Sequence, residues 1–131
     1  MTNAEHLSAI HRIDLPRIVL VGESILNKSC SVCHELGFRT ALIVTGKTTY
    51  QVAGKQAQIF LEEDGIGANC IFVEDATLET VGKVTEEAEK LDADVILGVG
   101  GGRNIDVAKL SAHKTNRFFI SVPTVASHDG I

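Results

Sequence analysis

The sequence predicts an α/β domain in which helices cover both faces of a parallel β-sheet. Short runs of uninterrupted apolar residues alternate along the chain with stretches that have helical periodicity. Uninterrupted apolar runs are typical of strands buried on both faces, and parallel strands need right-handed helical crossovers. The length of 131 residues suits one domain with a sizeable core. Because no repeat, low-complexity stretch or linker interrupts the pattern, residues 1–131 are expected to form a single Rossmann-like domain.

The expected strands are the five apolar runs that follow an initial segment without a clear period. Glycine ends the first two runs, and Pro123 is expected to end the last, because proline has no N–H for the ladder. The predicted strands are 18–22, 41–46, 70–73, 95–99 and 118–122.

Four stretches between these strands have the spacing of amphipathic helices. The third is the clearest, because its apolar residues fall on one side and its charged residues on the other. The predicted helices are 25–36, 52–64, 80–91 and 104–113. The second helix is expected to bury Val52, Ala53, Ala57, Phe60 and Leu61, and the third to bury Val81, Val84, Ala88 and Leu91.

Composition and charge exclude several classes of function. The formal charge of −5 makes a broad nucleic-acid-binding face improbable. No apolar run approaches the roughly 20 residues that span a bilayer. Residues 1–10 lack the basic-then-apolar order of a signal peptide. The protein is therefore expected in the cytoplasm, without a membrane span and without a nucleic-acid partner.

A glycine-rich loop follows the fourth predicted strand. Gly100, Gly101 and Gly102 precede a predicted helix, and consecutive glycines let a bulky anion approach the backbone. The start of the helix offers free N–H groups and the positive end of its dipole, so phosphate or pyrophosphate is the expected ligand. The loop departs from the strict dinucleotide fingerprint, because Arg103 stands where that motif has its third glycine. The alternative is a tight turn that needs small residues only for packing.

Asp106 lies about one turn into the helix that follows this loop. It is interpreted as a residue that orients the loop or a cofactor ribose. The alternative is a surface ion pair with Lys109, which would contribute little to stability.

A second polar loop follows the fifth predicted strand. It presents Thr124, Ser127, His128 and Asp129. Hydroxyl groups could bind a cofactor amide or phosphate, and a carboxylate could accept hydrogen bonds from a polyol. The alternative, equally supported by the residue types, is a cluster that caps a helix N-terminus. His128 is a candidate for the lining of the substrate pocket, and no proton-transfer role is assigned to it.

The segment from Cys30 to His34 has the C-x-x-C-H spacing of c-type haem attachment. The pair lies inside a predicted helix, with Cys33 on its apolar side, and no signal peptide is expected. A mid-helix position also argues against a thioredoxin-like thiol, and structural zinc would need four ligands. We therefore predict that these cysteines are reduced and pack in the core. His6, His11 and His113 are expected at the surface.

The two loops together, GGGRNIDVAK and FISVPTVASHDGI, resemble the sn-glycerol-1-phosphate dehydrogenases of the archaeal type. That family belongs to a group that also contains iron-containing alcohol dehydrogenases, glycerol dehydrogenases and 3-dehydroquinate synthases. Residues 19–23 and 43–46 are similar to weaker motifs of the family. The resemblance implies the N-terminal half of a dehydroquinate synthase-like fold, with helices on both faces of the sheet.

The activity implied by the resemblance is the reduction of dihydroxyacetone phosphate to sn-glycerol 1-phosphate by NADPH or NADH, for the synthesis of archaeal membrane lipids. Carried over by position, residues 102–106 would contact the pyrophosphate and a ribose, and residues 124–127 the nicotinamide half. Residues 45–48 would lie near the adenine ribose, and Asp129 would bind the substrate. The expected cofactor-binding residues are Gly100, Gly101, Gly102, Arg103, Asn104, Ile105, Asp106, Thr124, Val125, Ala126, Ser127, Thr45 and Thr48.

The segment after the second strand bears on the choice of cofactor. A carboxylate there selects NAD by bonding the ribose 2′-hydroxyl and repelling a 2′-phosphate. Here the sequence from Thr45 to Thr48 holds no carboxylate and one cation, Lys47. We therefore predict that NADPH is accepted, with NADH left open as a second cofactor. The alternative is that Lys47 is solvated and has no role.

Members of the family are longer than this chain. In them a helical second domain supplies an Asp and two His that hold a catalytic zinc, and the zinc polarises the substrate carbonyl. These ligands would lie beyond Ile131, so no catalytic residue and no metal ligand is predicted here. The chain alone is expected to bind nucleotide without catalysis, and the full-length protein to form a homo-oligomer. The alternatives are a glycerol or polyol dehydrogenase of the same group and a stand-alone nucleotide-binding module.

Overall fold

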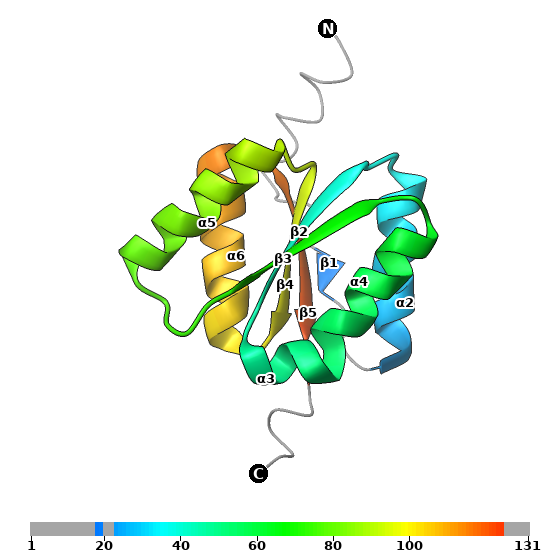
Figure 1. Ribbon diagram of the computed structural model, residues 1–131, viewed down its shortest axis with the longest axis horizontal. Helices are drawn as coiled ribbons and strands as arrows, with labels where there is room; N and C mark the ends of the chain where they lie inside the picture. Colours follow the sequence, from blue (N-terminus) through cyan, green and yellow to red (C-terminus); the bar gives the residue numbers. More distant parts are fainter. Residues whose placement is uncertain (1–17, 20–22, 125–131) are drawn as a thin grey trace, which may run out of the picture.

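The computed structural model describes residues 18–19 and 23–124, which form a three-layer α/β domain (Figure 1). The elements in chain order are β1 (Ile18–Val19), α2 (Glu23–Glu35), β2 (Thr40–Thr45), α3 (Lys47–Thr49), the π-helical turn η1 (Tyr50–Gly54), α4 (Lys55–Glu63), β3 (Gly67–Phe72), α5 (Leu78–Leu91), β4 (Val95–Gly100), α6 (Gly102–Thr115) and β5 (Phe118–Pro123).

The five strands form one parallel sheet in the order β1-β5-β4-β2-β3. Helices α2 and α4 cover one face, and α5 and α6 cover the other (Figure 1). The predicted fold class is therefore confirmed. None of the described helices is long and apolar enough to cross a bilayer.

Alternate residues of the central strands point to opposite faces of the sheet and pack in two separate core clusters. Ile43 and Leu97 point into the cluster beneath α2 and α4, whereas Leu42 and Ile96 join Val84 beneath α5 and α6. All five side chains are fully buried. Each contributes about 1.5–3 kcal/mol through burial, which explains why uninterrupted apolar runs were a sound signal for these strands.

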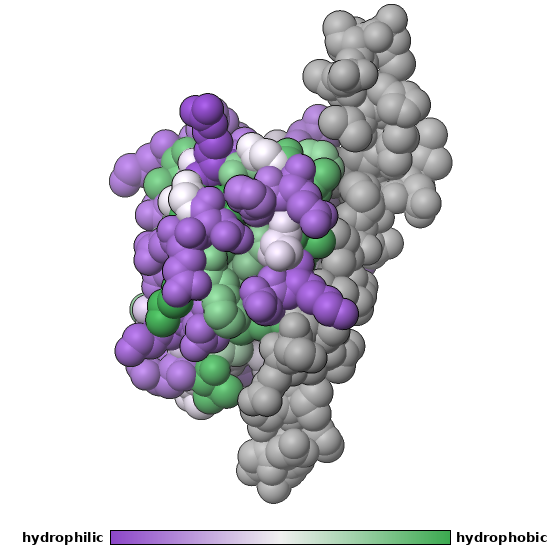
Figure 2. Space-filling view, turned by 90° about the vertical axis from the view of Figure 1, so that its right-hand side faces the viewer, coloured by the Kyte–Doolittle hydropathy of each residue, from purple (hydrophilic) through white to green (hydrophobic). Residues whose placement is uncertain are grey.

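The outer surface over α2 and α4 is largely hydrophilic, with hydrophobic surface showing between the charged side chains (Figure 2). Val52 and Ile59 are among the large hydrophobic side chains that remain exposed.

The structure corrects the expected end of the last strand. Pro123 was predicted to break the ladder, yet β5 includes it, paired in register with Gly100. Successive amides of a parallel strand point alternately to its two neighbours. The amide of Thr124 donates to the carbonyl oxygen of Gly100 on β4 at 3.1 Å, so the position of Pro123 faces away from β4. The missing N–H of Pro123 therefore removes no bond between these two strands.

The helix predicted at 52–64 begins earlier than expected. A continuous helical run starts at Lys47 and passes through the π-helical turn before α4. Val52, expected on the inner side, is 59% exposed, and Gly54 is buried instead. Ala53, Ala57 and Leu61 are buried as predicted, and Phe60 is half-buried. The prediction for Val52 was wrong because a π turn inserts an extra residue and rotates the start of the buried face. A Cβ on Gly54 would lie only 3.0 Å from the Tyr50 ring, so a side chain there would force the ring to shift.

Helix α5 matches its predicted buried face. Val81, Val84 and Ala88 are buried and Leu91 is half-buried. Thr77 caps the N-terminus by accepting a hydrogen bond from the Thr80 amide at 3.1 Å. The helix is therefore specified both by its apolar face and by its cap.

Helix α6 starts at Gly102, two residues before the predicted start. It packs very closely on β4, because a Cβ on Gly98 would lie 2.9 Å from the Ala108 Cβ and 3.0 Å from the Ile105 Cα. Gly100 has a φ of +136°, and a Cβ there would lie 2.3 Å from the side-chain nitrogen of Asn104. These two glycines are thus required for packing and backbone conformation.

Replacement of Gly100 by alanine is expected to lower the free energy of unfolding by about 2–4 kcal/mol, because it adds backbone strain and a steric clash. The matched control is Gly82→Ala on α5, where a Cβ would meet no atom within 4 Å. That change should be neutral or raise the stability by about 0.5–1 kcal/mol. Urea unfolding of the two variants measures both effects, and equal stabilities would contradict the close packing.

Candidate functional site

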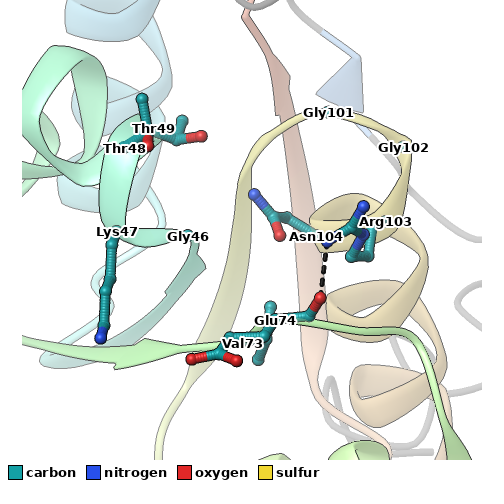
Figure 3. Close-up of a pocket in the computed structure, with 10 residues that line it drawn as sticks. All are labelled: Gly46, Lys47, Thr48, Thr49, Val73, Glu74, Gly101, Gly102, Arg103 and Asn104. Carbon is teal, nitrogen blue, oxygen red and sulfur yellow. Dashed lines mark hydrogen bonds between the residues drawn. The ribbon is translucent and has the colours of Figure 1, made fainter.

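A cavity of about 490 Å³ opens at the carboxyl edge of the sheet, where ligands collect in open α/β folds. Its walls come from the start of α3, the end of β3 and the start of α6 (Figure 3). The residues that line it are Gly46, Lys47, Thr48, Thr49, Val73, Glu74, Gly101, Gly102, Arg103 and Asn104.

Two helix N-termini face this cavity. Gly46 precedes α3 and Gly101 precedes α6, and neither start has a side-chain cap. The first intrahelical bonds run from the Tyr50 amide to the Gly46 oxygen (2.8 Å) and from the Ile105 amide to the Gly101 oxygen (3.1 Å). The amides before them have no partner within their helices. Two sets of N–H donors and two positive dipole ends therefore meet at one site, which suits a ligand with more than one anionic group.

Asn104 holds the glycine turn in shape from inside. Its side chain is 7% exposed, and its amide nitrogen donates to the Val99 carbonyl oxygen at 3.2 Å. The same nitrogen would lie 3.7 Å from a Cβ on Gly46, so Asn104 fills the space between the starts of the two helices. A buried side chain that bonds the backbone in this way fixes the amides that line the cavity.

Arg103 connects α6 with the segment after β3. Its Nη1 donates to the carbonyl oxygen of Glu74 at 2.5 Å, as the dashed line in Figure 3 shows. The side chain is exposed, so its charge also contributes to the electrostatics of the cavity. Lys47 adds a second cation, and Glu74 adds an anion. The site thus carries mixed charge, with a positive excess.

The structure brings together several residues that the sequence assigned to a cofactor. Thr48 lies in the lining with the four residues from Gly101 to Asn104. The predicted residues that the structure describes outside this lining are Thr45, Gly100, Ile105, Asp106 and Thr124. Thr45 is fully buried at the end of β2, and Asp106 is exposed on α6. Asp106 and Lys109 form no ion pair in the structure. The cofactor roles of all these residues stay predictions.

The second polar loop is described only at its start. Thr124 is tied to the glycine turn by its amide bond to Gly100. The remaining predicted site residues, Val125, Ala126, Ser127, His128 and Asp129, lie outside the described residues, as do His6 and His11.

Sequence reasoning missed Glu74 as a residue of this cavity. It was right that the segment after the second strand holds no carboxylate, but one enters the same cavity from the end of β3. The available signal was the position of Glu74 directly after the third predicted strand, because the carboxyl ends of parallel strands lie at one edge. Thr49 and Val73 were also missed, whereas Gly46 falls within the range 45–48 that was expected near the adenine ribose.

Cys30 and Cys33 do not line this cavity. Cys30 and Cys33 are at most 1% exposed and pack in the core beneath α2 and α4, as predicted. Burial raises the pKa of each thiol to about 12. His34 and His113 are exposed, which confirms the prediction for His113. Within residues 18–19 and 23–124, no three His, Cys, Asp or Glu side chains come together as a metal site.

The family model described as iron-containing alcohol dehydrogenase matches residues 20–131. The chain belongs to this family. The resemblance drawn from the two loops is thereby confirmed at the level of the family.

Relatives in the family carry a more specific name. The chain is 47% identical over 120 residues to the glycerol-1-phosphate dehydrogenase [NAD(P)+] of Methanosarcina barkeri, covering 91% of this chain and 34% of that protein. It is 42% identical over 126 residues to the protein of the same name from Staphylothermus marinus, covering 94% of this chain and 36% of the relative. The chain therefore spans about a third of the length of these curated relatives.

Solved structures of dehydrogenases share the fold. Glycerol dehydrogenase from Schizosaccharomyces pombe superposes with a TM-score of 0.72 at 22% identity, covering 82% of this chain and 28% of that chain. NADH-dependent butanol dehydrogenase A from Thermotoga maritima gives a TM-score of 0.65 at 27% identity, covering 74% of this chain and 25% of that chain. The first likeness supports the α/β architecture and nothing further.

The buried thiols predict a loss of stability at high pH. Folding raises the pKa of both thiols above their value in the unfolded chain, which is about 8.5–9. The folded state therefore keeps its full stability below about pH 8.5 and loses stability as the pH rises toward 12, because the unfolded chain releases these protons first. A rise in pH from about 7.5 to 10 should lower the free energy of unfolding by roughly 1–2 kcal/mol for each thiol. Urea unfolding at the two pH values measures the loss.

The double variant Cys30→Ala/Cys33→Ala separates the thiols from other groups that titrate at high pH. It should lose distinctly less stability over the same pH interval. An equal loss in both proteins would show that these thiols are not buried as the structure has them.

Proposed function

We propose that this chain is the dinucleotide-binding domain of a glycerol-1-phosphate dehydrogenase that uses NAD(P). The observation that carries the proposal is the cavity at the carboxyl edge, where two uncapped helix N-termini face each other. The names of the relatives, at 42–47% identity, support the substrate. The whole protein would reduce dihydroxyacetone phosphate to sn-glycerol 1-phosphate for membrane lipid synthesis.

The residues of the cavity fit a dinucleotide. The pyrophosphate would bind the amides at the start of α6, where Gly101 and Gly102 have open space and expose the backbone. Arg103 would offset part of its charge. The adenosine ribose would lie toward the start of α3, beside Lys47 and Thr48.

The nicotinamide half is proposed to bind residues 124–127, and the substrate to bind Asp129. The amide bond between Thr124 and Gly100 supports this arrangement, because it starts that loop beside the glycine turn. The bound cofactor supplies the hydride for the reduction. The chain's own contribution is to hold the two ends of the cofactor in a fixed relation, so that the substrate meets it in one orientation.

The described residues do not fit a zinc site. We propose that the zinc ligands belong to a helical domain outside this chain, since the chain covers only 34–36% of the relatives. The chain by itself would then bind the cofactor without reducing the substrate. The full-length protein is proposed to be a cytoplasmic homo-oligomer.

The test is calorimetric titration of the chain with NAD⁺ and NADP⁺. One dinucleotide should bind per chain, and Gly102→Glu should weaken binding at least about tenfold, because it places a carboxylate where the phosphates bind. The variant should stay folded, since Glu is favoured in the first turn of a helix.

Gly82→Glu is the matched control, because it adds the same charge on α5 at a position with open space. It should bind as the unaltered chain does. Failure of the unaltered chain to bind either nucleotide, or equal binding by Gly102→Glu, would overturn the proposal.

The chain with NADPH, zinc and dihydroxyacetone phosphate should show no oxidation of NADPH.

A further inference from the structure

Two side chains of opposite charge line the part of the cavity proposed above to hold the adenosine. Lys47 comes from the first residue of α3, and Glu74 comes from the segment that runs from β3 beneath the start of α6 (Figure 3). Both side chains are exposed, and they form no ion pair with each other. Each charge is therefore available to a ligand in the cavity.

The two charges have opposite preferences at the ribose 2′-position. A carboxylate accepts hydrogen bonds from ribose hydroxyls and repels a 2′-phosphate. An ammonium group attracts the phosphate and contributes less to a neutral hydroxyl. A cavity that holds one of each does not exclude either form of the cofactor.

We propose that Lys47 and Glu74 act as opposed specificity-determining residues that make this site accept both NAD and NADP. The inference rests on the proposed function. Glu74 would bind the ribose hydroxyls of NAD, and Lys47 would bind the 2′-phosphate of NADP. The selectivity of the site is then the balance between the two side chains.

The position of Glu74 is fixed through its backbone. Its carbonyl oxygen accepts the hydrogen bond from Arg103, and the amide of the preceding Val73 donates to the Thr45 oxygen at 2.9 Å. The residue is thus anchored to α6, which forms one wall of the cavity, and to β2, the strand that precedes α3. This anchoring holds its side chain beside the site and leaves the carboxylate free to contact a ligand.

The neighbouring carboxylate, Asp75, forms its hydrogen bonds outside the cavity. Its Oδ1 accepts hydrogen bonds from the hydroxyls of Thr77 and Thr80 at the start of α5, and these bonds lower its pKa. Asp75 is absent from the lining of the cavity. Of these two adjacent acids, only Glu74 is placed to contact a ligand there.

Two features of the site favour binding of the 2′-phosphate of NADP. Lys47 lies at the start of α3, so its ammonium group adds to the helix dipole and to the free amides of the first turn. This combination offsets the repulsion between Glu74 and a 2′-phosphate. Acceptance of NADP is therefore compatible with a carboxylate in the same cavity.

The experiment measures dissociation constants of the 131-residue chain for NAD⁺ and NADP⁺ by calorimetry, with adenosine 5′-monophosphate and adenosine 2′,5′-bisphosphate as smaller probes. Glu74→Gln should shift the ratio of the two constants about tenfold toward NADP⁺. Lys47→Gln should shift it about tenfold toward NAD⁺. Both shifts should shrink in about 0.5 M salt, because the groups are exposed.

Glu79→Gln and Lys83→Gln are matched controls, since both remove the same charges from α5 outside this cavity. They should leave the ratio unchanged. Binding of neither dinucleotide by the unaltered chain would refute the proposed function and this inference together. Binding of both, with a ratio that Glu74→Gln and Lys47→Gln leave unchanged or shift no more than the controls do, would refute this inference alone.

Discussion

The close approach of α6 to β4 is the constraint on which the site depends. It is possible because Gly98 carries no side chain, since a Cβ there would lie 3.0 Å from the backbone of Ile105. Gly100 then turns the chain with a positive φ, and Asn104 returns its side chain to bond the Val99 oxygen. Together these contacts place the free amides of the first turn of α6 at the carboxyl edge of the sheet.

The strand order supplies the other wall. Because β2 lies directly beside β4, the helical run that begins after β2 starts opposite the first turn of α6. Neighbouring β3 brings Glu74 to the same edge, where Arg103 binds its carbonyl oxygen. A site for a ligand with several charged groups thus follows from the parallel topology, without any long excursion of the chain.

The sequence predicted the features that depend on the local pattern of apolar and small residues. The buried strands and the inner face of α5 follow from apolar periodicity, and the glycine turn follows from three successive small residues. It did not predict the start of the helical run at Lys47, because that first turn buries nothing. It placed Val52 on the buried face, whereas the π turn leaves Val52 exposed and buries Ala53 and Gly54. Glu74 was missed because its role depends on strands that are distant in the sequence. The bonds around Pro123 likewise depend on pairing with β4.

The most direct test of the site is a backbone amide NMR titration of the chain with ADP-ribose, which contains the pyrophosphate and adenosine without the nicotinamide. The amides of residues 47–49 and 101–104 should show the largest shifts among the described residues, because they line the cavity from its two helix starts. Shifts concentrated instead on the outer faces of α2 and α4, or no shift in either segment at saturating ligand, would contradict a dinucleotide site at this edge of the sheet.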